Sequence, residues 1–223
     1  MSKTVLGIDE AGRGAVVGDM IICGLLVEEN DLDKLSEIGV KDSKDLSSYK
    51  RNKLFSKIKD IAKDFVIIEV TAKDIDRERE ERSLNRIESI RMAEIIDVLE
   101  PDKVVVDSTE VNTEKIEAEL RSRLKDSLKD EVEMVVENYA DETYPVVSGA
   151  SILAKVTRDE SIKTLEGRLN KTIGKGYPSD TRTIKFLKEI LRENGKFPDY
   201  VRKSWSTASR IKAEIEQKNL GDY

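Results

Sequence analysis

A short apolar run near the N-terminus ends in two acids and a glycine turn, and this pattern constrains the fold most. Residues 4–10 are expected to form a buried strand, because a short apolar run bounded by a turn signal is typical of one. Asp9 and Glu10 lie at its end, a Gly-Arg-Gly turn occupies 12–14, and a second apolar run covers 16–27. We therefore expect two antiparallel strands joined across the glycine turn.

The rest of the chain alternates strands with helices and then becomes helical. Apolar runs predict strands over 65–70, 103–107 and 132–137. The spacing of apolar residues predicts helices over 48–63, 83–99, 113–128, 145–169, 180–193 and 204–219. This order is typical of an α/β fold with a mixed sheet flanked by helices. We expect one domain over 1–223, with 180–223 as a helical C-terminal extension packed on it.

The amino-acid composition limits the catalytic mechanisms and metal sites that the chain can have. The 223 residues contain no histidine, which excludes mechanisms built on a histidine base and most zinc sites. Any hydrolysis must therefore rest on carboxylates and hard metal ions. The one cysteine, Cys23, lies in an apolar run and excludes a disulfide framework. Because no signal peptide and no run of about 18 apolar residues is present, we expect a soluble cytoplasmic protein with no membrane partner.

Charge is distributed unevenly along the chain. The net charge is −6, yet residues 144–223 contain 16 Lys and Arg against 10 Asp and Glu. A basic C-terminal third beside an acidic front can hold a polyanion next to a metal site. Charge alone, however, favours a helical surface laced with solvated ion pairs.

Four carboxylates stand where loops leave predicted strands: Asp9, Glu10, Asp107 and Asp141. Active sites of open α/β sheets lie at the carboxyl ends of strands. If the first and fourth strands are neighbours, Asp9 and Asp107 face each other across about 4.8 Å. That spacing suits two Mg²⁺ ions about 4 Å apart, as in two-metal phosphoryl transfer. Glu10 joins Asp9 only if the strand ends or twists there, since successive residues point to opposite faces. The alternative is ordinary strand-end acids that face water.

The chain resembles ribonuclease HII, the type 2 ribonuclease H, in a series of short motifs. In order they are Gly7–Gly14, Asp42–Ser47, Val104–Ser108, Ala140-Asp141, Tyr144–Asp159 and Gly176–Asp180. The resemblance implies the ribonuclease H-like fold, a five-stranded mixed sheet with helices on both faces. It implies endonucleolytic cleavage of RNA in RNA–DNA hybrids, including cuts 5′ to single ribonucleotides in duplex DNA, with 3′-hydroxyl and 5′-phosphate products. The four carboxylates match the family's catalytic ligands for Mg²⁺ or Mn²⁺.

The resemblance also implies substrate contacts. Gly12, Arg13 and Gly14 match the turn that recognises the ribose 2′-OH, the group that separates RNA from DNA. Tyr177 matches a tyrosine that stacks on the sugar at the RNA–DNA junction, and Lys44 a lysine that contacts a backbone phosphate. Without the resemblance, Tyr177 is a loop aromatic and Lys44 a surface charge.

Other residues depart from the family pattern or allow two interpretations. Ala15 and Asp19 stand where the family usually has proline. Ser148 and Ser151 can bond phosphate, but small residues on a helix more often serve close packing. Trp205 can stack on a base, but a tryptophan beside a helix start is more often part of the core.

The C-terminal segment Gln217–Tyr223 resembles the peptide that docks on DNA sliding clamps, although it has only one of the usual two aromatics. A frayed helix end is the alternative. The default expectation for the chain is a monomer.

Two rival functions remain open. A junction-resolving or other DNA nuclease is disfavoured by the Gly-Arg-Gly turn and Tyr177, because DNA offers no 2′-OH. A non-catalytic hybrid-binding module is disfavoured by the four acids, because binding alone favours neutral or basic groups.

Overall fold

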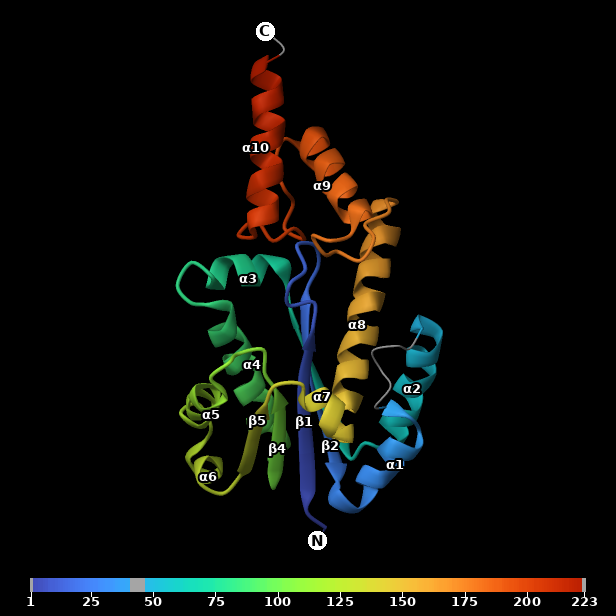
Figure 1. Ribbon diagram of the computed structural model, residues 1–223, viewed down its shortest axis with the longest axis vertical. Helices are drawn as coiled ribbons and strands as arrows, with labels where there is room; N and C mark the ends of the chain where they lie inside the picture. Colours follow the sequence, from blue (N-terminus) through green and yellow to red (C-terminus); the bar gives the residue numbers. More distant parts are fainter. Residues whose placement is uncertain (1, 41–46, 222–223) are drawn as a thin grey trace. The chain divides into compact units, whose positions relative to one another are not determined.

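The computed structural model describes residues 2–40 and 47–221, without the side chains of Ser48 and 218–221. Its strands are β1 (Thr4–Ala11), β2 (Met20–Glu28), β3 (Asp64–Val70), β4 (Lys103–Asp107) and β5 (Glu133–Glu137) (Figure 1). Its helices are the 3₁₀ helix η1 (Glu29–Asp31), α1 (Leu32–Glu37), α2 (Ser48–Ile61), α3 (Ala72–Glu78), α4 (Leu84–Leu99), α5 (Thr113–Arg121), α6 (Asp126–Lys129), α7 (Ala140–Thr143), α8 (Pro145–Leu169), α9 (Thr181–Asn194) and α10 (Ser206–Gly221). None of the helices in these ranges is long and apolar enough to cross a membrane.

The strands in the described ranges form one five-stranded sheet with the order β3-β2-β1-β4-β5. Strand β1 pairs antiparallel with β2 and parallel with β4, and β4 pairs parallel with β5. This mixed sheet confirms the predicted fold class. It also confirms that the two strands ending in Asp9 and Asp107 are neighbours.

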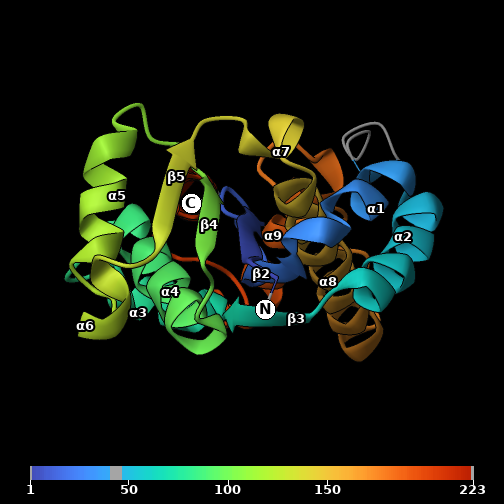
Figure 2. The same cartoon turned by 90° about the horizontal axis from the view of Figure 1, so that it is seen from below.

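Helices cover both faces of this sheet (Figures 1 and 2). A Cβ added to Gly7 would lie 2.5 Å from the backbone of Val146 in α8, whereas one added to Gly24 would meet Ile95 of α4. Because β1 and β2 alternate faces in register, α8 and α4 pack on opposite sides of the sheet. By the same alternation, Asp9 points to the α8 side and Glu10 to the α4 side.

The described chain divides into two compact units. Unit 1 comprises residues 1–11, 21–68 and 85–157, and unit 2 comprises residues 12–20, 69–84 and 158–223. Unit 1 has a core between the sheet and α8 that includes Cys23, whose burial raises the pKa of its thiol. Unit 2 has its own core, built largely from α9 and α10. The expected single domain, with 180–223 as an extension packed on it, stays a prediction.

Three element predictions need correction. The second strand begins at Met20 rather than at 16, because Val16 and Val17 donate their N–H groups to the carbonyl of Gly176 instead. The predicted helix over 113–128 is broken after Arg121, whose guanidinium turns to the carbonyls of Lys129 and Val132. The short helices α1, α3 and α7 were not predicted, since each buries too few apolar residues to give a helical period.

Candidate active site

Asp9 and Asp107 stand at adjacent positions at the carboxyl ends of β1 and β4. The parallel register pairs Ile8 with Val106, and the next residue of each strand is the acid. Asp9 is only 5% exposed. Its burial, with the nearby charge of Asp107, raises the pKa of Asp9 to about 7. Two oxygen-rich groups held close together in this way favour a hard cation between them.

Helix α8 supplies two polar side chains to Asp9. The Lys155 ammonium donates to the Ser151 hydroxyl at 2.6 Å, and Ser151 donates to the Asp9 carboxylate. Both favour the ionised form of Asp9, which opposes the effect of burial on its pKa. Ser151 is fully buried, yet its hydroxyl acts on Asp9, so close packing describes only part of its role. The one available signal was the four-residue spacing of Ser151 and Lys155 on one helix face.

Glu10 approaches Asp107 from the other face of the sheet. Glu10 and Asp107 line the same small cavity, of about 20 Å³, together with Asn85 and Glu88 of α4. A cavity of this size accommodates one water-sized ligand. Asp107 thus shares a cavity with Glu10 and acts on Asp9 through its charge, and the grouping of Glu10 with Asp9 stays a prediction.

Asp141 is buried in the short helix α7. The preceding Ala140 donates its N–H to the Asp107 carboxylate at 2.8 Å, which places the backbone of Asp141 one residue from that bond. The hydroxyl of Ser148 donates to the carbonyls of Asp141 and Tyr144, so Ser148 secures this turn. Across the described residues, no three His, Cys, Asp or Glu side chains are placed to hold one metal ion.

The Gly-Arg-Gly turn belongs to unit 2. Gly12 has φ +84°, a conformation that favours glycine, and its carbonyl accepts the N–H of Ala15 at 3.2 Å. Proline has no such N–H, so alanine at 15 closes the turn with a bond that the usual family residue lacks. The carbonyl of Arg13 accepts a bond from the Arg202 side chain at 2.8 Å, and Gly14 is exposed.

Asp19, the second departure from the family pattern, has a structural role. Its carboxylate accepts the N–H of Ala72 at 3.1 Å, at the start of α3. Thr71 caps the same helix end by accepting the N–H of Asp74. A carboxylate at a helix N-terminus satisfies an otherwise unpaired donor. Asp19 therefore stabilises α3.

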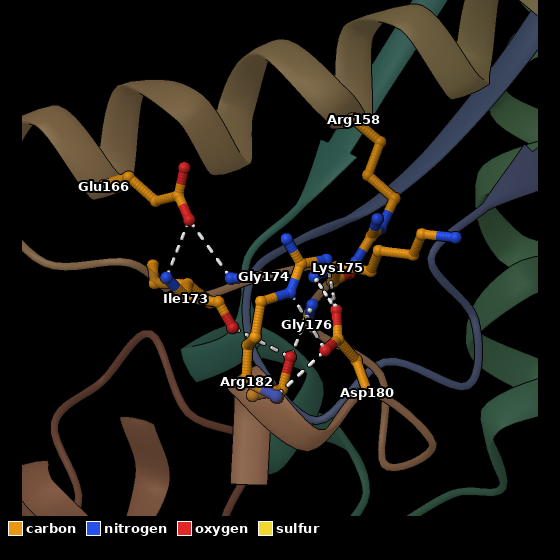
Figure 3. A network of polar contacts seen from close by, with 9 residues as sticks. Arg158, Glu166, Ile173, Gly174, Lys175, Gly176, Asp180 and Arg182 are labelled. Carbon is orange, nitrogen blue, oxygen red and sulfur yellow. Dashed lines mark hydrogen bonds and ion pairs between the residues drawn. The ribbon is translucent and has the colours of Figure 1, made fainter. Parts of the chain in front are cut away.

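The loop that leads to Tyr177 is bonded at every peptide N–H from 173 to 176. Glu166 accepts the first two N–H groups, Asp180 the third and Thr183 the fourth (Figure 3). These N–H groups lie in a loop and have no backbone acceptor from a helix or strand in the described part of the chain, so three side chains supply the acceptors instead. Tyr177 is thus half-buried on a firmly held loop.

Asp180 gives this loop a pH-dependent stability. The Arg182 side chain and the N–H of Lys175 donate to Asp180 and hold the pKa of its carboxyl well below its usual range. The stabilisation is therefore complete above about pH 4, where an unfolded aspartate ionises, and is lost as the pH falls toward the folded pKa. We expect Asp180→Asn to lower the free energy of unfolding by about 1 kcal/mol at pH 7 and by a smaller amount at pH 2. Urea denaturation of both proteins at the two pH values measures this, and an equal difference at both would contradict it.

Three further predictions concern Lys44, the clamp-binding segment and Trp205, and only Trp205 lies wholly within the described residues. Lys44 lies outside them, and so do the side chains of the predicted clamp-binding segment beyond Gln217. Trp205 is half-buried against the core of unit 2, with the guanidinium carbons of Arg79 and Arg202 at 4.8 and 4.9 Å from its ring centroid. The expectation that Trp205 belongs to the core is thereby confirmed.

Several known proteins are similar to this chain over nearly its whole length. The sequence profile of the Ribonuclease HII family matches residues 6–208. Ribonuclease HII of Methanothrix thermoacetophila is 42% identical over 209 residues, which is 94% of this chain and 97% of the relative. The crystal structure of the ribonuclease H2 from Pyrococcus horikoshii OT3 superposes with a TM-score of 0.88 at 38% identity, covering 96% of this chain and 99% of that one. The ribonuclease HII of Archaeoglobus fulgidus, solved as a PCNA:RNase HII complex, has a TM-score of 0.83 at 37% identity and covers 93% of this chain and 96% of its own.

Each of these matches spans nearly the whole chain, and the residues that the family profile matches include Asp9 and Asp107. Ribonucleases H are metal-dependent enzymes. The chain belongs to the ribonuclease HII family, whose members degrade the RNA of RNA–DNA hybrids, and it is a hydrolytic endoribonuclease.

Proposed function

We propose that this enzyme also cuts 5′ to single ribonucleotides embedded in duplex DNA, and that it works by a two-metal mechanism that leaves 3′-hydroxyl and 5′-phosphate ends. The adjacency of Asp9 and Asp107 at the ends of two parallel strands is the observation that carries this proposal. It brings two carboxylates to the edge of the sheet where active sites of α/β folds lie.

The donor set fits Mg²⁺ or Mn²⁺. Asp9, Glu10, Asp107 and Asp141 offer only oxygen donors, and the raised pKa of Asp9 reflects a burial that a divalent cation would offset. When bound, such ions supply an activated water and stabilise the charge on the leaving oxygen. Ser151 and Lys155 favour the ionised form of Asp9 and orient it, and the N–H of Ala140 orients Asp107. No side chain is then required as a general base.

For the substrate, we propose that Gly12, Arg13 and Gly14 read the 2′-OH and the adjacent phosphates. Tyr177 would stack on the sugar at the RNA–DNA junction, and Lys44 would contact a phosphate. The positive φ of Gly12 and the exposure of Gly14 support an open turn whose backbone can approach a sugar closely. Such a reader separates ribose from deoxyribose through one hydroxyl.

The deciding experiment is cleavage of a DNA duplex that contains one ribonucleotide, in Mg²⁺ or in Mn²⁺, beside an all-DNA duplex. We expect one cut 5′ to the ribonucleotide and none in the control. Cleavage of all-DNA would favour a DNA nuclease. Binding without a cut in either metal would favour a non-catalytic module.

We further propose that Gln217–Tyr223 docks on a sliding clamp, since a 37% identical relative forms a complex with PCNA. Deleting these seven residues should weaken binding to the clamp at least about tenfold, because the plugging side chains are lost. Cleavage without the clamp should be unchanged. Surface plasmon resonance on immobilised clamp measures the first, and equal affinity of the two proteins would refute the assignment. Light scattering tests our proposal that the free enzyme is a monomer.

A further inference from the structure

Unit 2 contains two buried arginines that take no part in the proposed catalysis. Arg158 is 4% exposed and Arg202 is fully buried. Neither forms an ion pair with any residue that the structure describes. Burial of an unpaired charge is expensive, so a fold that retains two of them requires a reason.

Both guanidinium groups bind main-chain carbonyls of the proposed substrate-reading segments. Arg202 donates from Nη1 to the carbonyl of Arg13 at 2.8 Å and from Nε to that of Gly18 at 3.1 Å. Arg158 donates from Nη2 to the carbonyl of Lys175 at 2.7 Å. One arginine therefore holds the Gly-Arg-Gly turn, and the other holds the loop that leads to Tyr177.

Arg158 also contacts both segments directly. Its guanidinium carbon lies 4.5 Å from the centroid of the Tyr177 ring. A Cβ on Gly12 would lie 2.5 Å from its Nε, and a Cβ on Gly176 would lie 2.8 Å from its Nη2. The side chain is thus packed between the turn and the loop, as Figure 3 shows for the loop side. Only glycine at 12 and 176 leaves room for it.

Each of the two arginines also has one buried N–H donor that is not used in a hydrogen bond among the described residues. Arg158 Nε and Arg202 Nη2 are buried, and neither has a hydrogen-bond partner in the part of the chain that the structure describes. Asp19 and Asp76 act on Arg202 through their charges, and burial lowers the pKa of Arg202 to about 10, which leaves it protonated near neutral pH.

We propose that Arg158 and Arg202 are positioning residues that hold the Gly-Arg-Gly turn and Tyr177 as one preorganised reader of the ribose 2′-OH. The inference rests on the proposed function, because it concerns how the substrate-reading segments are held. Neither arginine needs to touch the substrate. Their effect is to fix the two segments at the spacing that one ribose requires.

The test is steady-state cleavage of the single-ribonucleotide duplex by Arg158→Lys and Arg202→Lys. Lysine keeps the charge but loses the planar fork and the stacking on the aromatic ring. We expect KM to rise about tenfold or more while kcat changes less than about threefold. The inhibition constant of an all-DNA competitor should rise much less, since that duplex offers phosphates but no 2′-OH to misplace.

Ile190→Val is the matched control, because it trims a buried side chain in the core of the same unit. It should lower Tm and leave KM unchanged. Lysine variants that behave like this control, or that leave KM unaltered, would show that the arginines are merely structural and overturn the inference. If a lysine variant is insoluble, Arg158→Gln keeps a planar donor for the Lys175 carbonyl and takes its place.

A double-mutant cycle with Tyr177→Leu adds a second measurement. If Arg158 acts through Tyr177, the two substitutions should raise KM by much less together than the product of their separate effects. Multiplicative effects would contradict the coupling. Failure of the unmodified enzyme to cut the ribonucleotide duplex would instead refute the proposed function, which separates the two outcomes.

Discussion

Asp9→Asn should abolish most cleavage and leave the protein at least as stable as before. Asparagine retains an oxygen that accepts the bonds from Ser151 and from the N–H of Glu10, so local geometry is kept. It removes a charge that a metal ion needs, and we expect kcat to fall about a thousandfold. It also removes a buried negative charge next to Asp107, so Tm of the metal-free protein should rise. Cleavage assays and thermal unfolding in EDTA measure the two effects.

Asp102→Asn is the matched control for this change. Asp102 immediately precedes β4, and its carboxylate accepts the N–H and the hydroxyl of Thr4 at 2.7 and 2.8 Å. These bonds lower the pKa of Asp102, which marks the charge as stabilising. The same chemical change should therefore cost about 1 kcal/mol of stability here and leave cleavage within about twofold. A similar loss of activity in both variants would contradict a metal-binding role for Asp9.

Apolar periodicity was enough to predict the sheet. The runs that form β1 and β4 are apolar on both faces because helices cover both sides of the sheet, and such runs give a strong signal. The order of strands and helices then leaves few topologies. The break after Arg121 was missed because the chain keeps a helical composition there, while a tertiary contact of the Arg121 side chain ends the helix.

The central acids were recognisable from their place at strand ends, and the proximity of Asp9 and Asp107 followed once their strands were taken as neighbours. Alternation along β1 directs Asp9 and Glu10 to opposite faces of the sheet. The register with β4 places Asp107 beside Asp9, and Asp107 also shares a cavity with Glu10. The contributions of Ser151 and Lys155 depend on which face of α8 meets the sheet. Arg158 and Arg202 gave no signal at all, since buried arginines that bond to carbonyls have the same sequence appearance as surface ones.

Gly7→Ala should be among the most damaging single substitutions in unit 1. A Cβ at this position would lie 2.5 to 2.6 Å from backbone atoms of Val146 and Val147, at the start of α8. Backbone cannot move aside as the end of a side chain can, so either β1 or α8 must shift. We expect a loss of about 3 kcal/mol or more in the free energy of unfolding, measured by urea denaturation. Cleavage should also fall, because Asp9 lies two residues further along β1 and its partner Ser151 is on α8.

Gly167→Ala, in α8, is the control that separates the effect of the close contact at Gly7 from the general effect of replacing glycine. Nothing lies within 4 Å of a Cβ at Gly167, and alanine favours a helix more than glycine does. This variant should therefore gain about 0.5 to 1 kcal/mol. Opposite signs for the two substitutions would establish that the contact between β1 and α8, which brings Ser151 to Asp9, depends on the missing side chain of Gly7. A gain of stability in both variants would mean that the close approach can relax without cost.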